Sequence, residues 1–161
     1  MSSPTESRPS LARLVWTPVG LLVTWILLMW VIEFVDTVAL DDRLQRHGLR
    51  PREVDGLDGI MWAPFLHTDF GHLASNTVPF LALGGLVAVR GMRYWAWITA
   101  ITIVIGGGAT WLLGGSGLHV GASGVVFGYF GAILGAQIRV AADFGARTLH
   151  RLAALGHAAL D

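Results

Sequence analysis

HVGASGVVFGYFGAILG, residues 119–135, is the stretch that decides the fold. Its glycines recur every three or four residues, at Gly121, Gly124, Gly128, Gly131 and Gly135. On an α-helix that spacing places all of them on one face. The intervening residues are mostly Val, Phe, Ala, Ile and Leu, and none is charged. In a membrane, a stripe of missing side chains lets neighbouring backbones come close, so we expect other helices to enclose this one tightly.

Ser123 stands at the N-terminal end of this expected helix, between Ala122 and Gly124. Neighbours this small leave the hydroxyl uncovered, which makes Ser123 a candidate nucleophile. On this stretch alone, an ordinary serine among small packing residues is the simpler interpretation.

Composition indicates a membrane protein. The chain has 161 residues, of which 53% are hydrophobic and 14% are charged, against roughly 25% charged residues in soluble domains. The mean hydropathy is +0.59. A net charge of zero gives no reason to expect a nucleic-acid partner, and the absence of cysteine excludes disulfides and thiol catalysis.

Four apolar segments are long enough to cross a bilayer, which takes about 20 residues. They are residues 14–40, 72–89, 94–113 and 121–138. The sequence therefore predicts an all-α, polytopic transmembrane bundle within residues 11–138, preceded by a disordered tail at 1–10 and followed by an atypical segment at 139–161. Glu33 and Asp36 lie near the end of the first span, where we expect them at the membrane interface.

The connection at residues 41–71 is long and polar with apolar islands, and we expect residues 59–62 to lie half sunk among lipid headgroups. Arg90 and Arg93 fill one short loop, and further arginines follow the last span. The positive-inside rule then predicts a cytoplasmic N-terminus in a plasma membrane, although the arginines in 41–71 argue the other way. In this orientation the starts of the second and fourth spans share the outer side.

The second span opens with HTDFGHLASN, residues 67–76. His72 and Asn76 are four residues apart and share a helix face, and both can donate hydrogen bonds. An oxyanion site needs such a pair, but a polar helix end that bonds its own backbone has the same spacing. A metal site at His67, His72 and His119 lacks an acidic partner at fixed spacing, so we expect no metal.

In combination, these motifs resemble the rhomboid family of intramembrane serine proteases. The resemblance covers about residues 48–137. It rests on GLRPREVDGLDGI (48–60), APFLHTDFGHLASNTVPFLALGG (63–85) and WLLGGSGLHVGASGVVFGY (111–129). Each motif is weak alone, and their order along the expected spans makes the set specific.

The resemblance implies cleavage of transmembrane protein substrates by acyl transfer through Ser123. His72 and Asn76 would bind the oxyanion together with the Ser123 backbone N–H. Supporting positions would be His67 as an accessory histidine, Gly121 and Gly124 beside the serine, and Phe127, where many members carry tyrosine. The expected partners are these substrates, the lipid bilayer and a further copy of the chain; no cofactor is implied.

The resemblance also implies a base histidine on a later span, and the sequence does not provide it. After Arg139 come 22 residues, VAADFGARTLHRLAALGHAALD, too few for two more spans. His157 is a weak candidate for the base. The alternatives are a truncated or frameshifted chain, a base from a partner subunit, or a catalytically inactive rhomboid-like protein that acts as a scaffold for transmembrane segments. A small transporter is the weakest reading, because the chain has few intramembrane charges.

Overall fold

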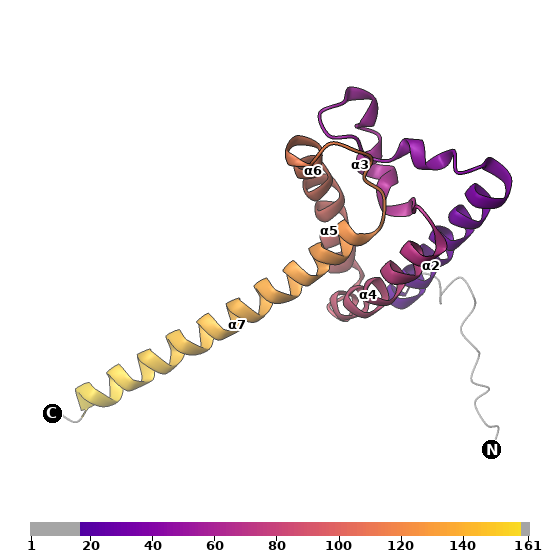
Figure 1. The fold of residues 1–161 in the computed structure, drawn as a ribbon. Helices are drawn as coiled ribbons and strands as arrows, with labels where there is room; N and C mark the ends of the chain where they lie inside the picture. The colour runs from indigo at the N-terminus through magenta and orange to yellow at the C-terminus, as the bar shows by residue number, and fades with distance from the viewer. Residues whose placement is uncertain (1–16, 159–161) are drawn as a thin grey trace, which may run out of the picture.

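A computed structural model describes the backbone of residues 17–158 and the side chains of 17–148 and of His150 (Figure 1). The tail expected at 1–10 lies outside the described residues. Four helical stretches have the length and hydropathy to cross a membrane: Pro18–Leu40, Phe70–Ala88, Met92–Leu113 and Ser123–Thr148. The expected all-α polytopic bundle is thus confirmed, and each span overlaps the segment predicted for it.

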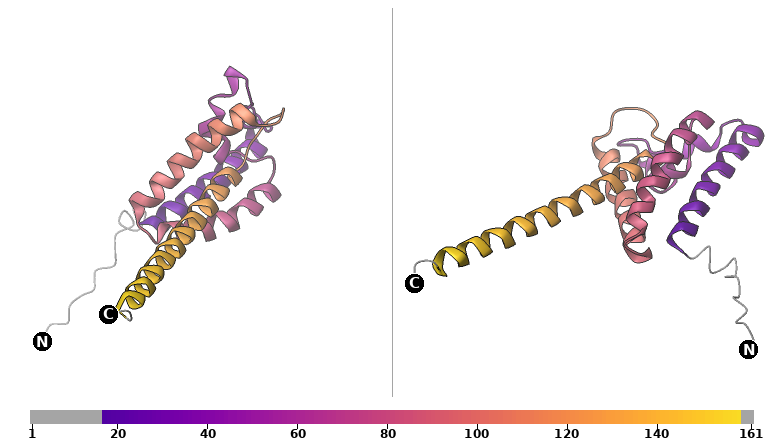
Figure 2. Two further views of the ribbon diagram at one scale, coloured as in Figure 1. Left: turned by 90° about the vertical axis from the view of Figure 1, so that its left-hand side faces the viewer. Right: turned by 90° about the horizontal axis from the view of Figure 1, so that it is seen from below.

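The spans are built from regular helix with two π-helical turns. α2 (Pro18–Val35) continues into the π turn Asp36–Leu40, and α4 (Phe70–Ala88) forms the second span. The third consists of α5 (Met92–Ile101), the π turn Thr102–Gly106 and α6 (Gly107–Leu113), and the fourth is α7 (Ser123–Ala158). α4 packs against both α2 and α7, as the two views in Figure 2 show.

The connection between α2 and α4 is folded into short helical turns. These are Leu44–His47, Val54–Gly56, α3 (Gly59–Trp62) and Ala63–Phe65. An isolated antiparallel bridge joins it to the loop before α7: the Leu49 N–H donates to His119 O at 2.9 Å, and the His119 N–H donates to Leu49 O at 2.8 Å. This bridge holds the long connection beside the segment that leads into Ser123.

Tyr129 lies at the centre of the core, where α2, α4, α5 and α7 meet. Its side chain is fully buried, its ring packs on Phe80, and its hydroxyl lies 2.8 Å from the Thr99 hydroxyl. Gly84 of α4 allows this approach, because a β-carbon there would stand 2.7 Å from Leu22 and 3.0 Å from Tyr129. Small and aromatic residues together therefore bring all four spans into contact.

The glycine stripe of α7 is enclosed only in part, which corrects the expectation of tight packing along its whole length. A β-carbon on Gly128 would overlap the Thr102 side chain. Gly124, Gly131 and Gly135, in contrast, have nothing within 4 Å on that side in the described part of the chain. One face of α7 packs against the π turn of the third span, and the rest of the stripe turns away from it.

α7 does not end near Arg139, where the sequence analysis placed its end. It runs for 36 residues to Ala158, which at a rise of 1.5 Å per residue is about 54 Å. Figure 2 shows its C-terminal half extending away from the other helices. The sequence after Arg139 is rich in Ala, Leu and Arg, which are strong helix formers, and it contains no proline to stop the helix.

Glu33 and Asp36 lie near the end of the first span, and both are buried within the protein. Their exposed fractions are 1% and 2%, so both carboxyl groups are covered by protein. Asp36 Oδ1 accepts the backbone N–H of Leu44 at 2.8 Å, because the connection after α2 folds back over the helix end. The folded connection therefore supplies a hydrogen-bond donor to Asp36.

Candidate active site

The start of α4 is fixed by Asp69, which caps the helix. Asp69 Oδ1 accepts the backbone N–H of His72 at 2.8 Å. This hydrogen bond, together with one from Thr68, lowers the pKa of the Asp69 carboxyl below its usual value. The cap sets the register in which His72 and Asn76 share one face of α4, as their spacing predicts.

His72 is oriented by a short relay of side chains. The Thr68 hydroxyl lies 3.0 Å from Asp69 Oδ2 and 3.1 Å from His72 Nδ1. The single hydroxyl proton of Thr68 can go to the carboxylate or to Nδ1, so the donor and acceptor roles at His72 depend on the tautomer of its ring. The other ring nitrogen, Nε2, is the atom that faces the loop before α7. Nε2 carries the proton that an oxyanion donor needs when Nδ1 is the acceptor.

Gly121 brings that loop against the ring. Its φ is +115°, and its N–H donates to the carbonyl of Ala63 at 2.8 Å. A β-carbon at Gly121 would lie 2.9 Å from Nε2 and Cε1 of His72 and 3.7 Å from the amide nitrogen of Asn76. The residue two positions before Ser123 therefore lies against the His72 ring and near Asn76, and only glycine fits there.

Asn76 serves the helix as well as the site. Its exposed fraction is 5%, and its amide donates one hydrogen bond to the carbonyl of His72 at 2.9 Å. This contact is the local backbone bond that the sequence analysis left open as an alternative. The amide carries two protons, so one remains for a ligand.

His67 supports the loop that leads into α7. Its exposed fraction is 1%, and its Nε2 accepts the backbone N–H of Ala122 at 3.4 Å. Its ring lies 5.2 Å from that of His72 at an interplanar angle of 70°. Burial, with a smaller contribution from His72, lowers the pKa of His67 to about 4, so the ring is neutral near pH 7 and remains an acceptor.

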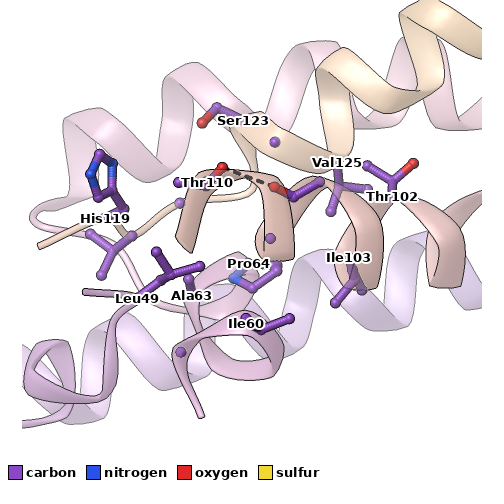
Figure 3. Close-up of a pocket in the computed structure, with 16 residues that line it drawn as sticks. Leu49, Ile60, Ala63, Pro64, Thr102, Ile103, Thr110, His119, Ser123 and Val125 are labelled. Carbon is purple, nitrogen blue, oxygen red and sulfur yellow. Dashed lines mark hydrogen bonds between the residues drawn. The ribbon is translucent and has the colours of Figure 1, made fainter. Parts of the chain in front are cut away.

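Ser123 is the first residue of α7 and lines a cavity of about 260 Å³ (Figure 3). The wall also includes His119 and residues of α3, the π turn and α6. His119 Nε2 lies 3.2 Å from the carbonyl of Gly115, which holds that ring to its own loop. Among the described residues, no hydrogen bond engages the Ser123 hydroxyl.

The C-terminal histidines lie far from Ser123 along α7. Along a continuous helix, position 150 lies about 40 Å from position 123 and position 157 about 51 Å. The His157 side chain lies outside the described residues, but the path of α7 contradicts its weak candidacy as a base within one chain. Phe127 projects outward with an exposed fraction of 72%, so it does not pack beside the other predicted site residues.

Comparison with known proteins identifies the family. The model of the Rhomboid domain family matches residues 57–159. The chain belongs to the rhomboid family. The match includes the segment after Arg139, which the sequence analysis had placed outside the family-like region, and it begins later than residue 48.

The curated relatives of this rhomboid chain are mycobacterial. An uncharacterized protein of Mycobacterium tuberculosis is 39% identical over 119 residues, which cover 70% of this chain and 49% of that protein. An uncharacterized protein of Mycobacterium leprae is 37% identical over 129 residues, covering 76% and 51%. The chain thus spans about half the length of the curated relatives it matches. No solved structure matches it.

Sequence reasoning missed two parts of this rhomboid site. Thr68 and Asp69 orient His72, and the Ala63 carbonyl holds the Gly121 turn. An aspartate three residues before His72, ahead of an apolar run, is a helix N-cap signal and would have revealed the first. The Ala63 contact joins residues far apart in the chain, and no local pattern announces it. Within the described residues, no three His, Asp or Glu side chains gather as a metal site would require.

Proposed function

We propose that this rhomboid protein contributes the nucleophile and oxyanion site of a serine endopeptidase that cleaves transmembrane protein substrates. The proposal is carried by one observation: the His72 ring lies against Gly121, two residues before Ser123. The Ser123 oxygen attacks the substrate carbonyl carbon, the peptide C–N bond breaks, and water then hydrolyses the acyl-enzyme ester.

In this reaction the oxyanion forms beside the first turn of α7. The Ser123 backbone N–H lies at the positive end of the helix dipole, and the donors on α4 approach from the other side of Gly121. His67 acts as a positioning residue, since it bonds the backbone of Ala122 rather than the reacting atoms.

The serine proton needs an acceptor, and the described residues do not place one at Ser123. We propose that a histidine from a membrane segment outside the described residues, or from a second copy of the chain, approaches the open side of α7. Gly124 leaves room for it, because nothing lies within 4 Å of a β-carbon there in the described part.

A second function, a catalytically inactive scaffold, is favoured by the same open face. Gly131 and Gly135 also lack neighbours among the described residues, and small residues on one helix face are a common docking surface for other transmembrane helices. In this case Ser123 would be dispensable and the stripe would not.

The protein is an integral membrane protein, and we propose the plasma membrane of a bacterium as its location. The mycobacterial relatives support this location. We further propose a cytoplasmic N-terminus, supported by the arginines at the turn between α4 and α5.

A fluorophosphonate probe distinguishes the two functions. The chain and its Ser123→Ala variant are reconstituted in liposomes and exposed to the probe. Labelling that requires Ser123 supports the protease. If labelling is absent, retained binding of a transmembrane peptide that is lost in Gly131→Leu, but kept in Ser123→Ala, supports the scaffold. Failure of both assays removes both proposals.

A further inference from the structure

Three arginines surround one hollow in the connection between α2 and α4. The hollow has a volume of about 560 Å³, and Arg43, Arg46 and Arg50 all line it. In the described part of the chain, no carboxylate lies within salt-bridge distance of these guanidinium groups. Of the two acids on the same wall, Asp58 pairs with His47 at 3.3 Å, which leaves Asp55 against three positive charges.

Arg52 lies in the same connection but, unlike the three arginines of the hollow, uses its guanidinium to hold the backbone of another segment. Its guanidinium donates to the carbonyl of Gly114 at 2.9 Å and to that of Leu112 at 3.5 Å, which ties the connection to the end of α6. Arg50 donates one hydrogen bond to the carbonyl of Arg46 at 3.0 Å and keeps its other donors. The arginines of the hollow therefore retain unused capacity for an anion.

An apolar hollow of about 380 Å³ adjoins the charged one. The two share Leu44 and His47 on their walls. The rest of the apolar wall comes from the α2 span and from the segment before α4: Ile32, Trp62, Phe65 and Leu66. A positively charged end and an apolar end thus lie side by side.

This pair of hollows lies where the spans end, so it faces the membrane boundary. The same connection exposes large apolar side chains, with exposed fractions of 75% for Val54, 56% for Met61 and 54% for Trp62. Side chains of this kind favour the zone between headgroups and acyl chains. A ligand at this depth has both a polar head and hydrocarbon.

We propose that the two hollows bind one anionic phospholipid, with its phosphate among the three arginines and an acyl chain in the apolar hollow. Guanidinium groups match phosphate oxygens in charge and in fork geometry. The site does not depend on whether Ser123 reacts. It borders the candidate active site, because Leu49, next to Arg50, pairs with His119 on the wall of the Ser123 cavity.

The test is lipid binding to the full chain in a neutral detergent. Short-chain phosphatidylglycerol and phosphatidylcholine with the same acyl chains are titrated, and bound lipids are counted by native mass spectrometry. We expect phosphatidylglycerol to bind with a stoichiometry of one. The combined variant Arg43→Gln, Arg46→Gln, Arg50→Gln should weaken phosphatidylglycerol binding roughly 100-fold, since each arginine contributes about 1 kcal/mol.

Arg93→Gln is the matched control, since this exposed arginine lies at the opposite end of the spans. The single variant Arg46→Gln, at an exposed position, serves if the combined variant does not fold. Equal affinity for phosphatidylcholine, unchanged affinity in Arg46→Gln, or a loss as large in Arg93→Gln would overturn the proposal. Binding of glycerol phosphate as tight as that of the lipid would show a site for a free phosphate anion and would overturn it too.

Discussion

Nε2 of His72 lies 2.9 Å from the point where a β-carbon on Gly121 would stand. This contact joins the start of α4 to the turn before α7, two segments separated by some fifty residues of chain. It leaves no room for a methyl group, and the φ of +115° at Gly121 strains any other residue.

Gly121→Ala is therefore expected to push the His72 ring aside and to twist the turn that presents Ser123. Labelling of Ser123 by a fluorophosphonate should fall by about 100-fold or more, the size of effect seen for a lost oxyanion donor. Gly85→Ala is the control, because this α4 glycine has nothing within 4 Å. Equal labelling of the Gly121 variant and the control would contradict the geometry described.

His72→Ala should lower proteolysis about 10²- to 10³-fold, mainly in kcat, because the lost interaction is made to the developing oxyanion rather than to bound substrate. The measurement is cleavage of a transmembrane substrate in liposomes. Ser75→Ala removes a neighbouring side chain that only bonds the carbonyl of His72, so it should leave kcat nearly unchanged. A fall confined to KM would place His72 in substrate binding instead.

The Asp69 cap gives a stability prediction. Asp69→Ala should lower the melting temperature in detergent by about 2–5 °C, because the His72 N–H loses its acceptor at the start of α4. Asp69→Asn keeps a capping oxygen and should retain most of that stability. Similar losses in both variants would show that charge, rather than the cap, is what matters. The pKa of Asp69 is lowered in the folded state, so its contribution is present at neutral pH and is lost in strong acid.

His67 predicts a second loss of stability on acidification, between pH 6.5 and about 4. Its pKa falls from 6.5 to about 4 on folding, because burial disfavours the charged ring. Below pH 6.5 the unfolded chain binds a proton that the folded chain does not, so stability should decrease as pH falls from 6.5 towards 4 and then level off. Melting temperatures across this range measure the effect. His67→Gln can still accept the Ala122 N–H but does not titrate, so its curve should be flatter over the same interval.

Tyr129→Phe tests the centre of the bundle. The variant leaves the Thr99 hydroxyl with its bond to the Trp95 carbonyl but removes its partner in α7, which should cost about 0.5–1.5 kcal/mol. Tyr94→Phe, at a half-buried position with an arginine over its ring, is the comparison. Denaturation in mixed micelles reports the difference. No difference between the variants would remove the Thr99 contact as a source of stability.

Local sequence patterns were enough to predict the spans. About twenty apolar residues must cross a bilayer as helix, because backbone polar groups find no other partners in lipid. The same reasoning located the start of α4, where the four-residue step from His72 to Asn76 fixes a shared face whatever the rest of the molecule does. The motifs also pointed to the rhomboid family, which the family match confirms.

Two features depended on contacts between distant segments, and only the tertiary structure decided them. The glycine spacing predicts one helix face, but whether a neighbour covers it depends on packing: Thr102 fills the space at Gly128 and nothing described fills it at Gly131. Asp36 is buried and accepts the N–H of Leu44 from the connection that folds back over the helix end, which its distance from the end of an apolar run does not reveal. The length of α7 is different, because the local sequence already lacks a stop signal after Arg139; we interpreted the charges there as the end of the helix.

The approach of Gly121 to His72 also depends on contacts between distant segments. The sequence determined that a serine, two donors and a glycine turn exist, and in what order. Their meeting requires the bridge between Leu49 and His119 and the bond from Gly121 to Ala63, which join residues far apart in the chain. Periodicity reports which residues share an element, and only the packed structure brings elements together.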